Sequence, residues 1–409
     1  MEKLVQKRVR KYGVDILKIV AMNMVNILHV LGQGKVLSNT ETNSLNFYIA
    51  NYIETAAYCS VNAYAIVSGY LIITSKCNHL KIIPLWLTVA FYSGIIKALF
   101  TFVPQLYELN PTEKSIKSLL KFFLAPASSN VYWYFTAYFG MYFFIPYMNR
   151  VLLTLSEKEY RKLIITIIIL FTCLPLVNLH TKDIFHINNG NSIWWLGCLY
   201  VIGGYFKLYP IKMSKILSLV MFFVSVTIAW SSIFIKSINL IRHDSIFIVF
   251  SGLFLFLFFY DIKVTNTTLQ KLLVIGSSTS FSVYLIHVHP IIFKLLLNRY
   301  SSYSRNPSYL LVLKVLGTAL AIYLVCTSID FFRYYLFKFL RVDSIPRVIE
   351  EKFLKEKEIK EDRDDKENLI NKESNEEEEN NDEIEEEGKD ITTKREFSNG
   401  ELLELRIVP

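Results

Sequence analysis

Long runs of apolar residues, separated by short polar stretches, recur along most of the chain. A helix needs about 20 apolar residues to cross the hydrocarbon core of a membrane, where its backbone groups must be paired internally. The pattern therefore predicts an all-α, polytopic integral membrane bundle of about ten transmembrane helices. The expected spans cover residues 12–31, 52–73, 83–104, 131–152, 161–179, 191–207, 215–235, 244–260, 278–298 and 308–337.

A shorter segment, residues 115–124, has apolar side chains along one face of a helix and lysines along the other. Such a segment is typical of a helix that lies on the membrane surface. The first span has polar residues within its apolar region, and no small-residue cleavage site follows it. We therefore expect it to be retained rather than removed as a signal peptide.

Composition agrees with a membrane protein, since 52% of the 409 residues are hydrophobic and the mean hydropathy is +0.33. The net charge of +8 conceals a division: residues from Pro346 onward hold 23 acidic and 12 basic side chains, and the preceding part holds 13 and 32. So acidic a segment buries too little surface to offset the entropy of ordering it. We predict a transmembrane domain over residues 1–342 and a disordered, acidic tail over residues 343–409.

The basic residues before the tail are distributed unequally between alternate loops. With the amino terminus in the cytoplasm, the cytoplasmic loops hold about twice as many lysines and arginines as the opposite loops, as the positive-inside rule requires. We therefore expect a multi-pass protein of the plasma membrane with both termini in the cytoplasm. Nucleic acid is not expected as a partner, because these charges lie between apolar spans rather than in one stripe.

Polar residues inside a span are costly and mark a pathway or a site by default. The first span concentrates them on one face, within about 80° of helix circumference: Asp15, Lys18, Met22, Asn26, His29 and Gln33. A histidine in this setting offers acid–base chemistry at physiological pH. An alternative for Asp15 and Lys18 is that both side chains reach the lipid headgroups, and an alternative for His29 is that it only hydrogen-bonds a neighbouring helix.

Other spans contribute further candidates. Glu54 and Ser68 lie in the second span. Glu54 is as consistent with a solvated rim residue as with a buried carboxylate, and Ser68 with Gly69 is also typical of a small-residue packing pair. Trp133 and Tyr134 begin the fourth span, and aromatic residues there are also typical of a membrane-interface belt. In the ninth span, Tyr284 and His287 share one face of the helix. In the tenth, Asp330 and Arg333 are predicted to form a surface ion pair.

Several classes of site are not indicated. The chain has no HExxH, P-loop or GxSxG motif and no CxxC, and His287 and His289 would point about 200° apart on a helix. We therefore predict no metal. The loops are too short to form a separate catalytic domain, so any chemistry must take place within the membrane bundle.

Four segments together resemble the membrane-bound acyltransferase type 3 family, which includes O-acetyltransferases of bacterial surface polysaccharides. Their order and spacing carry the resemblance through about 330 residues. They are Val14-Asp15-Ile16-Leu17-Lys18 with His29; Ala65-Ile66-Val67-Ser68-Gly69-Tyr70-Leu71; Tyr132-Trp133-Tyr134-Phe135 with Pro146; and Phe281-Ser282-Val283-Tyr284-Leu285-Ile286-His287.

The resemblance implies an O-acyltransferase with His29 as the catalytic residue and Lys18 at a position where the family carries arginine. Acetyl-CoA or another acyl-CoA would be the donor substrate, with no tightly bound cofactor. The acceptor would be a hydroxyl of an extracytoplasmic polysaccharide or glycolipid, and proteins of polysaccharide synthesis are expected as partners beside the lipid bilayer. Residues predicted to bind substrate or donor are Lys18, Asp15, Asn26, Glu54, Ser68, Trp133, Tyr134, Tyr284 and His287.

Two other functions are consistent with the polar stripe on the first span. In a transporter or flippase it would line a substrate or proton pathway, although no Gly/Pro-interrupted pair of spans supports this. In a non-catalytic membrane scaffold, Lys18 would reflect a lost activity and the acidic tail would recruit partners.

Overall fold

The computed structural model describes residues 10–75, 79–124, 131–177, 185–235 and 238–353, together with Pro126 and a few separate residues as far as position 368. Every regular element in these ranges is a helix. The chain divides into two compact units, Met1–Asp343 and Ser344–Pro409. Within the second unit, residues 345–353 are helical, and the rest of the predicted disordered tail lies largely outside the described residues.

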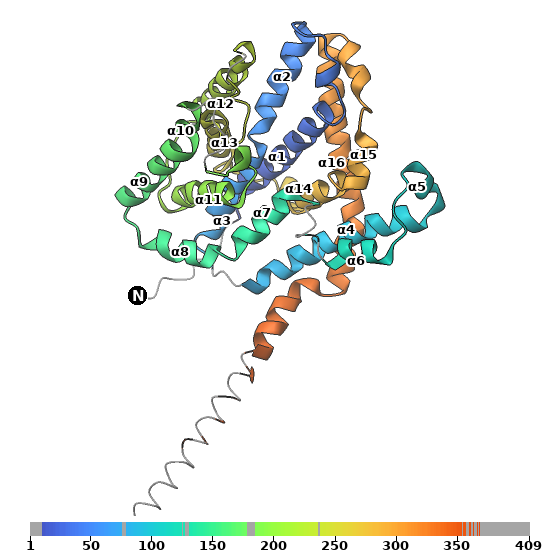
Figure 1. Cartoon of the computed structure of the whole chain (residues 1–409). Coiled ribbons are helices and arrows are strands. Elements are labelled where there is room, and N and C mark those ends of the chain that lie inside the picture. The colour runs from blue at the N-terminus through green and yellow to red at the C-terminus, as the bar shows by residue number, and fades with distance from the viewer. Residues whose placement is uncertain are drawn as a thin grey trace, which may run out of the picture. The chain divides into compact units, whose positions relative to one another are not determined.

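Helix α1 (Tyr12–Leu31) lies in the middle of the first unit (Figure 1). It packs against α2 (Leu45–Tyr58), α3 (Ser60–Ile72), α14 (Thr267–His287) and α16 (Ser308–Phe339). Because neighbours surround it, most of its apolar residues are buried, and its polar residues must find partners or cavities inside the bundle. The sequence-predicted bounds of this helix, 12–31, are confirmed.

Helices α3 and α11 (Ile193–Leu208) approach each other closely through glycines. A Cβ atom on Gly69 would collide with the carbonyl oxygen of Tyr200, and one on Gly203 would collide with that of Ile66. Small residues let helix backbones come together where lipid offers no hydrophobic driving force for association. Gly69 therefore allows α3 to pack closely against α11.

The other helices surround this centre or extend from it (Figure 1). The short helix predicted over residues 115–124 is confirmed as α6 (Ile116–Leu124), which packs on α4 (Ile83–Phe102). In chain order, the remaining α-helices are α4 (Ile83–Phe102), α5 (Pro104–Leu109), α6 (Ile116–Leu124), α7 (Trp133–Tyr142), α8 (Ile145–Thr154), α9 (Glu157–Ile168), α10 (Leu174–Val177), α12 (Lys215–Ser231), α13 (Ile246–Phe259) and α15 (Pro290–Leu296).

Five helices in the described part of the chain are long and apolar enough to cross a membrane. The shorter helices α11 and α13 are also apolar. The all-helical class and the membrane character are thus supported, whereas the predicted count of about ten spans is not confirmed. The five are Tyr12–Leu31, His79–Phe102, Lys215–Phe234, Thr267–His287 and Ser308–Phe339.

Some predicted spans are broken into two helices, which hydropathy did not reveal. These breaks account for part of the difference between about ten predicted spans and the five long apolar helices. The second predicted span is divided at Cys59 into α2 and α3. The fourth is divided between α7 and α8, where Pro146 occupies the first turn of α8, a position at which its missing N–H costs nothing. The ninth span, predicted at 278–298, was misplaced: α14 begins at Thr267 and ends at His287, and Pro290 starts the next helix.

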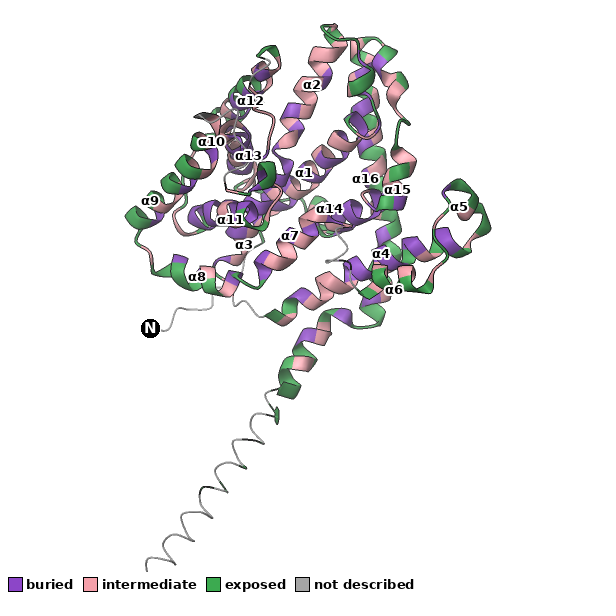
Figure 2. Cartoon of the chain, viewed as in Figure 1, coloured by how far each residue is buried: buried purple, intermediate pink, exposed green. Residues whose placement is uncertain are grey.

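Exposed residues lie on the outward faces of several helices (Figure 2), and many of them are large and apolar. Ile216 on α12 and Phe332 on α16 are 78% and 71% exposed. Exposed apolar surface of this extent is unfavourable in water and is what contact with lipid requires. The distribution of exposure therefore agrees with the hydropathy of the spans.

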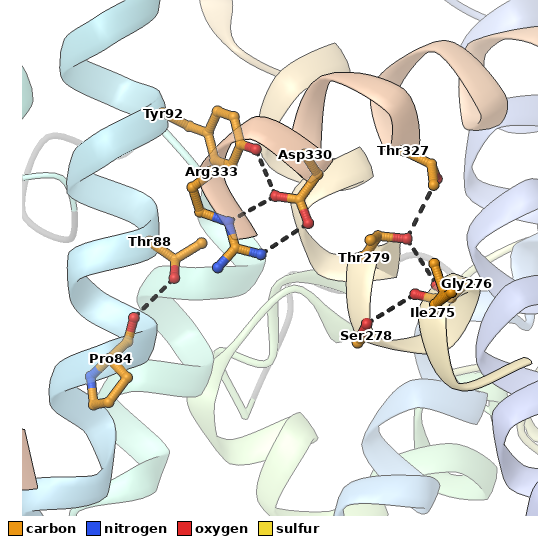
Figure 3. Close-up of polar contacts among 10 residues, drawn as sticks. All are labelled: Pro84, Thr88, Tyr92, Ile275, Gly276, Ser278, Thr279, Thr327, Asp330 and Arg333. Carbon is orange, nitrogen blue, oxygen red and sulfur yellow. Dashed lines mark hydrogen bonds and ion pairs between the residues drawn. The ribbon is translucent and has the colours of Figure 1, made fainter. Parts of the chain in front are cut away.

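An ion pair within α16 is joined to α4 by a hydrogen bond from Tyr92 (Figure 3). The guanidinium of Arg333 donates two hydrogen bonds, of 2.7 and 2.8 Å, to the carboxylate of Asp330, and the hydroxyl of Tyr92 donates a third of 2.5 Å. Asp330 is fully buried, so the predicted surface location of this pair was wrong. Helical spacing gives the i, i+3 contact but does not show that α4 covers it.

Candidate active site

A cavity of about 360 Å³ lies beside the last turns of α1, and we call it the histidine cavity. His29 of α1 and Gln33, just after this helix, reach it, together with residues of α2, α3, α7, α14 and two loops. The described lining residues are Met22, Val25, Leu28, His29, Gly32, Gln33, Glu54, Tyr58, Val61, Tyr64, Trp133, Tyr134, Asn191, His243, Phe281, Tyr284 and Val288.

His29 is joined to His287 of α14 by a hydrogen bond of 2.8 Å between its Nδ1 and Nε2 of His287. Nδ1 of His287 lies 2.6 Å from the backbone carbonyl oxygen of Val283. A carbonyl only accepts, so Nδ1 of His287 carries the proton and Nε2 holds a lone pair in the neutral ring. Nδ1 of His29 then donates to it, and Nε2 of His29 is left with a lone pair. The contacts thus select a tautomer of His29 that can accept a proton.

Aromatic side chains form much of the cavity wall. Trp133 and Tyr134, at the start of α7, and Tyr284, on α14, all line it. The rings of Tyr134 and Tyr284 meet edge to face at 6.4 Å, and the buried hydroxyl of Tyr284 has no hydrogen-bond partner among the described residues. Tyr64, which also lines the cavity, donates a 2.6 Å hydrogen bond to the backbone carbonyl of Lys18 and so connects α3 to α1.

Two loops, 185–192 and 238–245, supply Asn191 and His243. They pack closely: Gly190 has a φ of 90°, and a Cβ there would lie 2.5 Å from Cβ of His243. Asn62 of α3 donates a 2.8 Å hydrogen bond to the carbonyl of His243. Burial lowers the pKa of His243 to about 4, against the opposing effect of a backbone hydrogen bond at Tyr58. The ring is therefore neutral at physiological pH.

A second pocket, of about 340 Å³, lies beside the first turns of α1, and we call it the basic pocket. Arg10 donates hydrogen bonds of 2.7 and 3.0 Å to the buried carboxylate of Asp15, which also accepts one of 2.7 Å from Ser277. Lys11 is likewise paired with Asp261 at 3.2 Å, but basic side chains still outnumber acidic ones in the pocket lining. The pocket is lined by Arg10, Lys11, Val14, Asp15, Lys18, Tyr70, Leu71 and Lys207.

The predicted site residues separate into four groups. Asp15 and Lys18 line the basic pocket. His29, Glu54, Trp133, Tyr134 and Tyr284 line the histidine cavity, and His287 stands behind His29. Asn26 and Ser68 line neither: the Asn26 amide donates to the carbonyl of Ala319 on α16, and the Ser68 hydroxyl donates to that of Tyr64. The polar stripe of α1 is thus divided among the basic pocket, the histidine cavity and a contact with α16.

Several polar residues that line the two pockets were not predicted as site residues, among them Arg10, Lys11, Lys207, Asn191 and His243. Asn191 and His243 lie in polar stretches between apolar runs, and their sequence context resembles that of other loops. No group of three or more potential metal ligands of the types His, Cys, Asp or Glu occurs in the described ranges.

A family model described as an acyltransferase domain matches residues 11–329. The chain belongs to the acyltransferase type 3 family. The match runs from the residue before α1 almost to the buried Asp330 of α16, so the acyltransferase domain contains most of the lining of both pockets. No curated protein and no solved structure matches the chain.

Proposed function

We propose that this membrane acyltransferase transfers an acyl group, acetyl in the first instance, from acyl-CoA to a hydroxyl of a polysaccharide or glycolipid. The observation that carries the proposal is the hydrogen-bonded series Val283, His287 and His29 in the wall of the histidine cavity. It gives a general base with an assigned proton-accepting nitrogen, held beside a space large enough for a reacting group.

In the proposed reaction, the acceptor hydroxyl gives its proton to Nε2 of His29 while its oxygen attacks the thioester carbonyl. A C–O bond forms, the C–S bond breaks, and the leaving thiolate takes the proton back from His29. His287 accepts the hydrogen bond from Nδ1 throughout. It therefore orients the ring and stabilises the positive charge that His29 carries in the transition state.

The donor phosphates are assigned to the basic pocket. Lys18 and His29 are eleven residues apart on α1, which places them about 16 Å apart along the helix axis. A donor bound with its phosphates near Lys18 and its thioester near His29 would lie extended along this helix. Lysine supplies the charge there but not the planar fork with which arginine binds a phosphate in two places.

We further propose the orientation that the loop charges favour, with both termini in the cytoplasm of a plasma-membrane protein. The basic pocket, at the first turns of α1, then faces the cytoplasmic supply of acyl-CoA, and the histidine cavity lies towards the opposite side. Proteins of polysaccharide synthesis would supply the acceptor.

The decisive experiment uses the protein in liposomes with acetyl-CoA labelled in the acetyl group and an extract of surface glycans. The wild type is expected to label glycan, and His29→Ala is expected to lose this activity. His79→Ala is the matched control, because His79 is exposed and lies outside both pockets.

Equal labelling by the wild type and His29→Ala would contradict the proposal. Movement of unmodified glycan across the liposome membrane without labelling would favour a transporter instead.

A further inference from the structure

The histidine cavity and the basic pocket differ in charge. None of the described residues that line the histidine cavity is a lysine or an arginine, and Glu54 contributes a carboxyl group. Arg242, next to His243 in the chain, donates hydrogen bonds to both oxygens of the Asp244 carboxylate and is neutralised there. An anionic group entering this cavity would lose its hydration without gaining a cation, which is unfavourable in a buried site.

One end of the histidine cavity is formed by loops 185–192 and 238–245, and we call it the loop end. Several aromatic rings lie there, inclined to one another. The ring of His243 lies between Tyr58 and Trp133, with centroid distances of 4.9 and 6.3 Å and interplanar angles of 35° and 31°. Trp133 is half-buried and lines the cavity, so its indole presents an apolar surface to the space. Such a surface, negative over the ring face, suits the C–H groups on one side of a pyranose.

Polar atoms lie around this ring surface. Nδ1 of His243 and the hydroxyl of Tyr284 are buried and have no hydrogen-bond partner among the described residues. Buried polar groups are nearly always paired, so these two groups retain hydrogen-bonding capacity in the walls of the cavity. Asn191 and Glu54 add amide and carboxyl groups to the same lining.

We propose that the loop end of the histidine cavity is the acceptor subsite, and that it binds an uncharged sugar, stacked on Trp133, in preference to a sugar carrying a carboxylate or phosphate. Glu54, Asn191 and His243 bind its hydroxyls. This inference rests on the proposed function and deepens it, because it names the chemical class of the acceptor.

The test measures binding separately from transfer. Purified protein in nanodiscs is titrated with methyl glucoside, methyl galactoside and the methyl glycoside of glucuronic acid, followed by saturation-transfer NMR. We expect at least one neutral glycoside to bind more tightly than the glucuronide, by a factor on the order of 30. Trp133→Ala should weaken that binding about tenfold, whereas Trp133→Phe, which keeps an aromatic face, should stay within about threefold.

Trp194→Ala is the control, because Trp194 is 71% exposed and lies outside the cavity. Equal binding of neutral and charged glycosides, or no effect of Trp133→Ala, would overturn the subsite.

If no glycoside binds while release of CoA from acetyl-CoA still depends on His29, the subsite is wrong and the proposed function stands. If the neutral glycoside binds selectively but neither transfer nor CoA release occurs, the subsite stands and the proposed function fails.

Discussion

The two ends of α1 present opposite chemistry. At its first turns, lysines and an arginine surround a pocket in which Asp15 is already paired with Arg10. At its last turns, the lining contains histidines, aromatic rings and a carboxyl group. One helix thus separates a place suited to phosphates from a place suited to hydroxyls. If the donor binds as proposed, distance along a single helix keeps its phosphates away from the proposed reacting centre.

The largest effect is expected when the base, His29, is removed and the basic pocket is left intact. His29→Gln is expected to lower kcat by about 10²–10⁴-fold, because general base catalysis contributes a factor of that size. The Kd for CoA, measured by calorimetry, should not change, since the phosphates are assigned to the other end of α1. A large loss of CoA affinity would show that the two ends do not act separately.

Changing His287 tests whether it acts through His29. His287→Phe keeps a ring but removes the acceptor for Nδ1 of His29, and kcat is expected to fall by about 10–100-fold, as for other residues that orient a reactive histidine. His287→Gln, whose amide oxygen still accepts, should recover part of this loss.

The acid limb of the pH–rate profile should move in His287→Phe. A purely structural role would instead give equal losses in both variants and an unmoved profile.

A smaller effect is expected at the basic pocket. Lys18→Gln should raise the KM for acetyl-CoA about tenfold with little change in kcat, because one charged contact to a phosphate is lost. Lys18→Arg should match or improve on the wild type, since the guanidinium can bind a phosphate in two places. Lys271→Gln, at an exposed position of α14, is the control. An unchanged KM in Lys18→Gln would remove Lys18 from donor binding.

The smallest catalytic effect is expected at Asn26, which lies on α1 between the two ends. Its amide donates to Ala319, so Asn26→Ala should reduce stability by about 1 kcal/mol through loss of that hydrogen bond. The KM values for donor and acceptor should stay within about twofold. Thermal unfolding and initial rates check the two parts, and a changed KM at unchanged stability would place Asn26 in a binding site.

Much of the fold was predictable because hydropathy reports helix length directly. The bounds of α1 were predicted, and α4 and α16 lie within two residues of their predicted ends. The breaks near Cys59 and Pro146 were missed, since an apolar run continues across each of them. A bent or divided helix keeps the hydropathy of a straight one.

The sequence could place site residues together only where they lie on the same helix. Spacing on α1 indicated Lys18 and His29, but it also grouped Asn26 with them, because a helical projection shows a shared face and not which neighbour each side chain meets. The hydrogen bond from His29 to His287 joins residues 258 positions apart. Asn191 and His243 come from loops whose packing against each other follows from tertiary contacts.

The contact between Tyr92 and Asp330 has a consequence for how the protein is made. The two residues are 238 positions apart, so at about 5–20 residues per second the ribosome needs on the order of 10–50 s to reach Asp330 after Tyr92. Helix α4 is therefore synthesised long before its buried partner exists. During that interval the tyrosine hydroxyl must find another partner, such as water or lipid, and α4 can be joined to α16 only after Asp330 has been made.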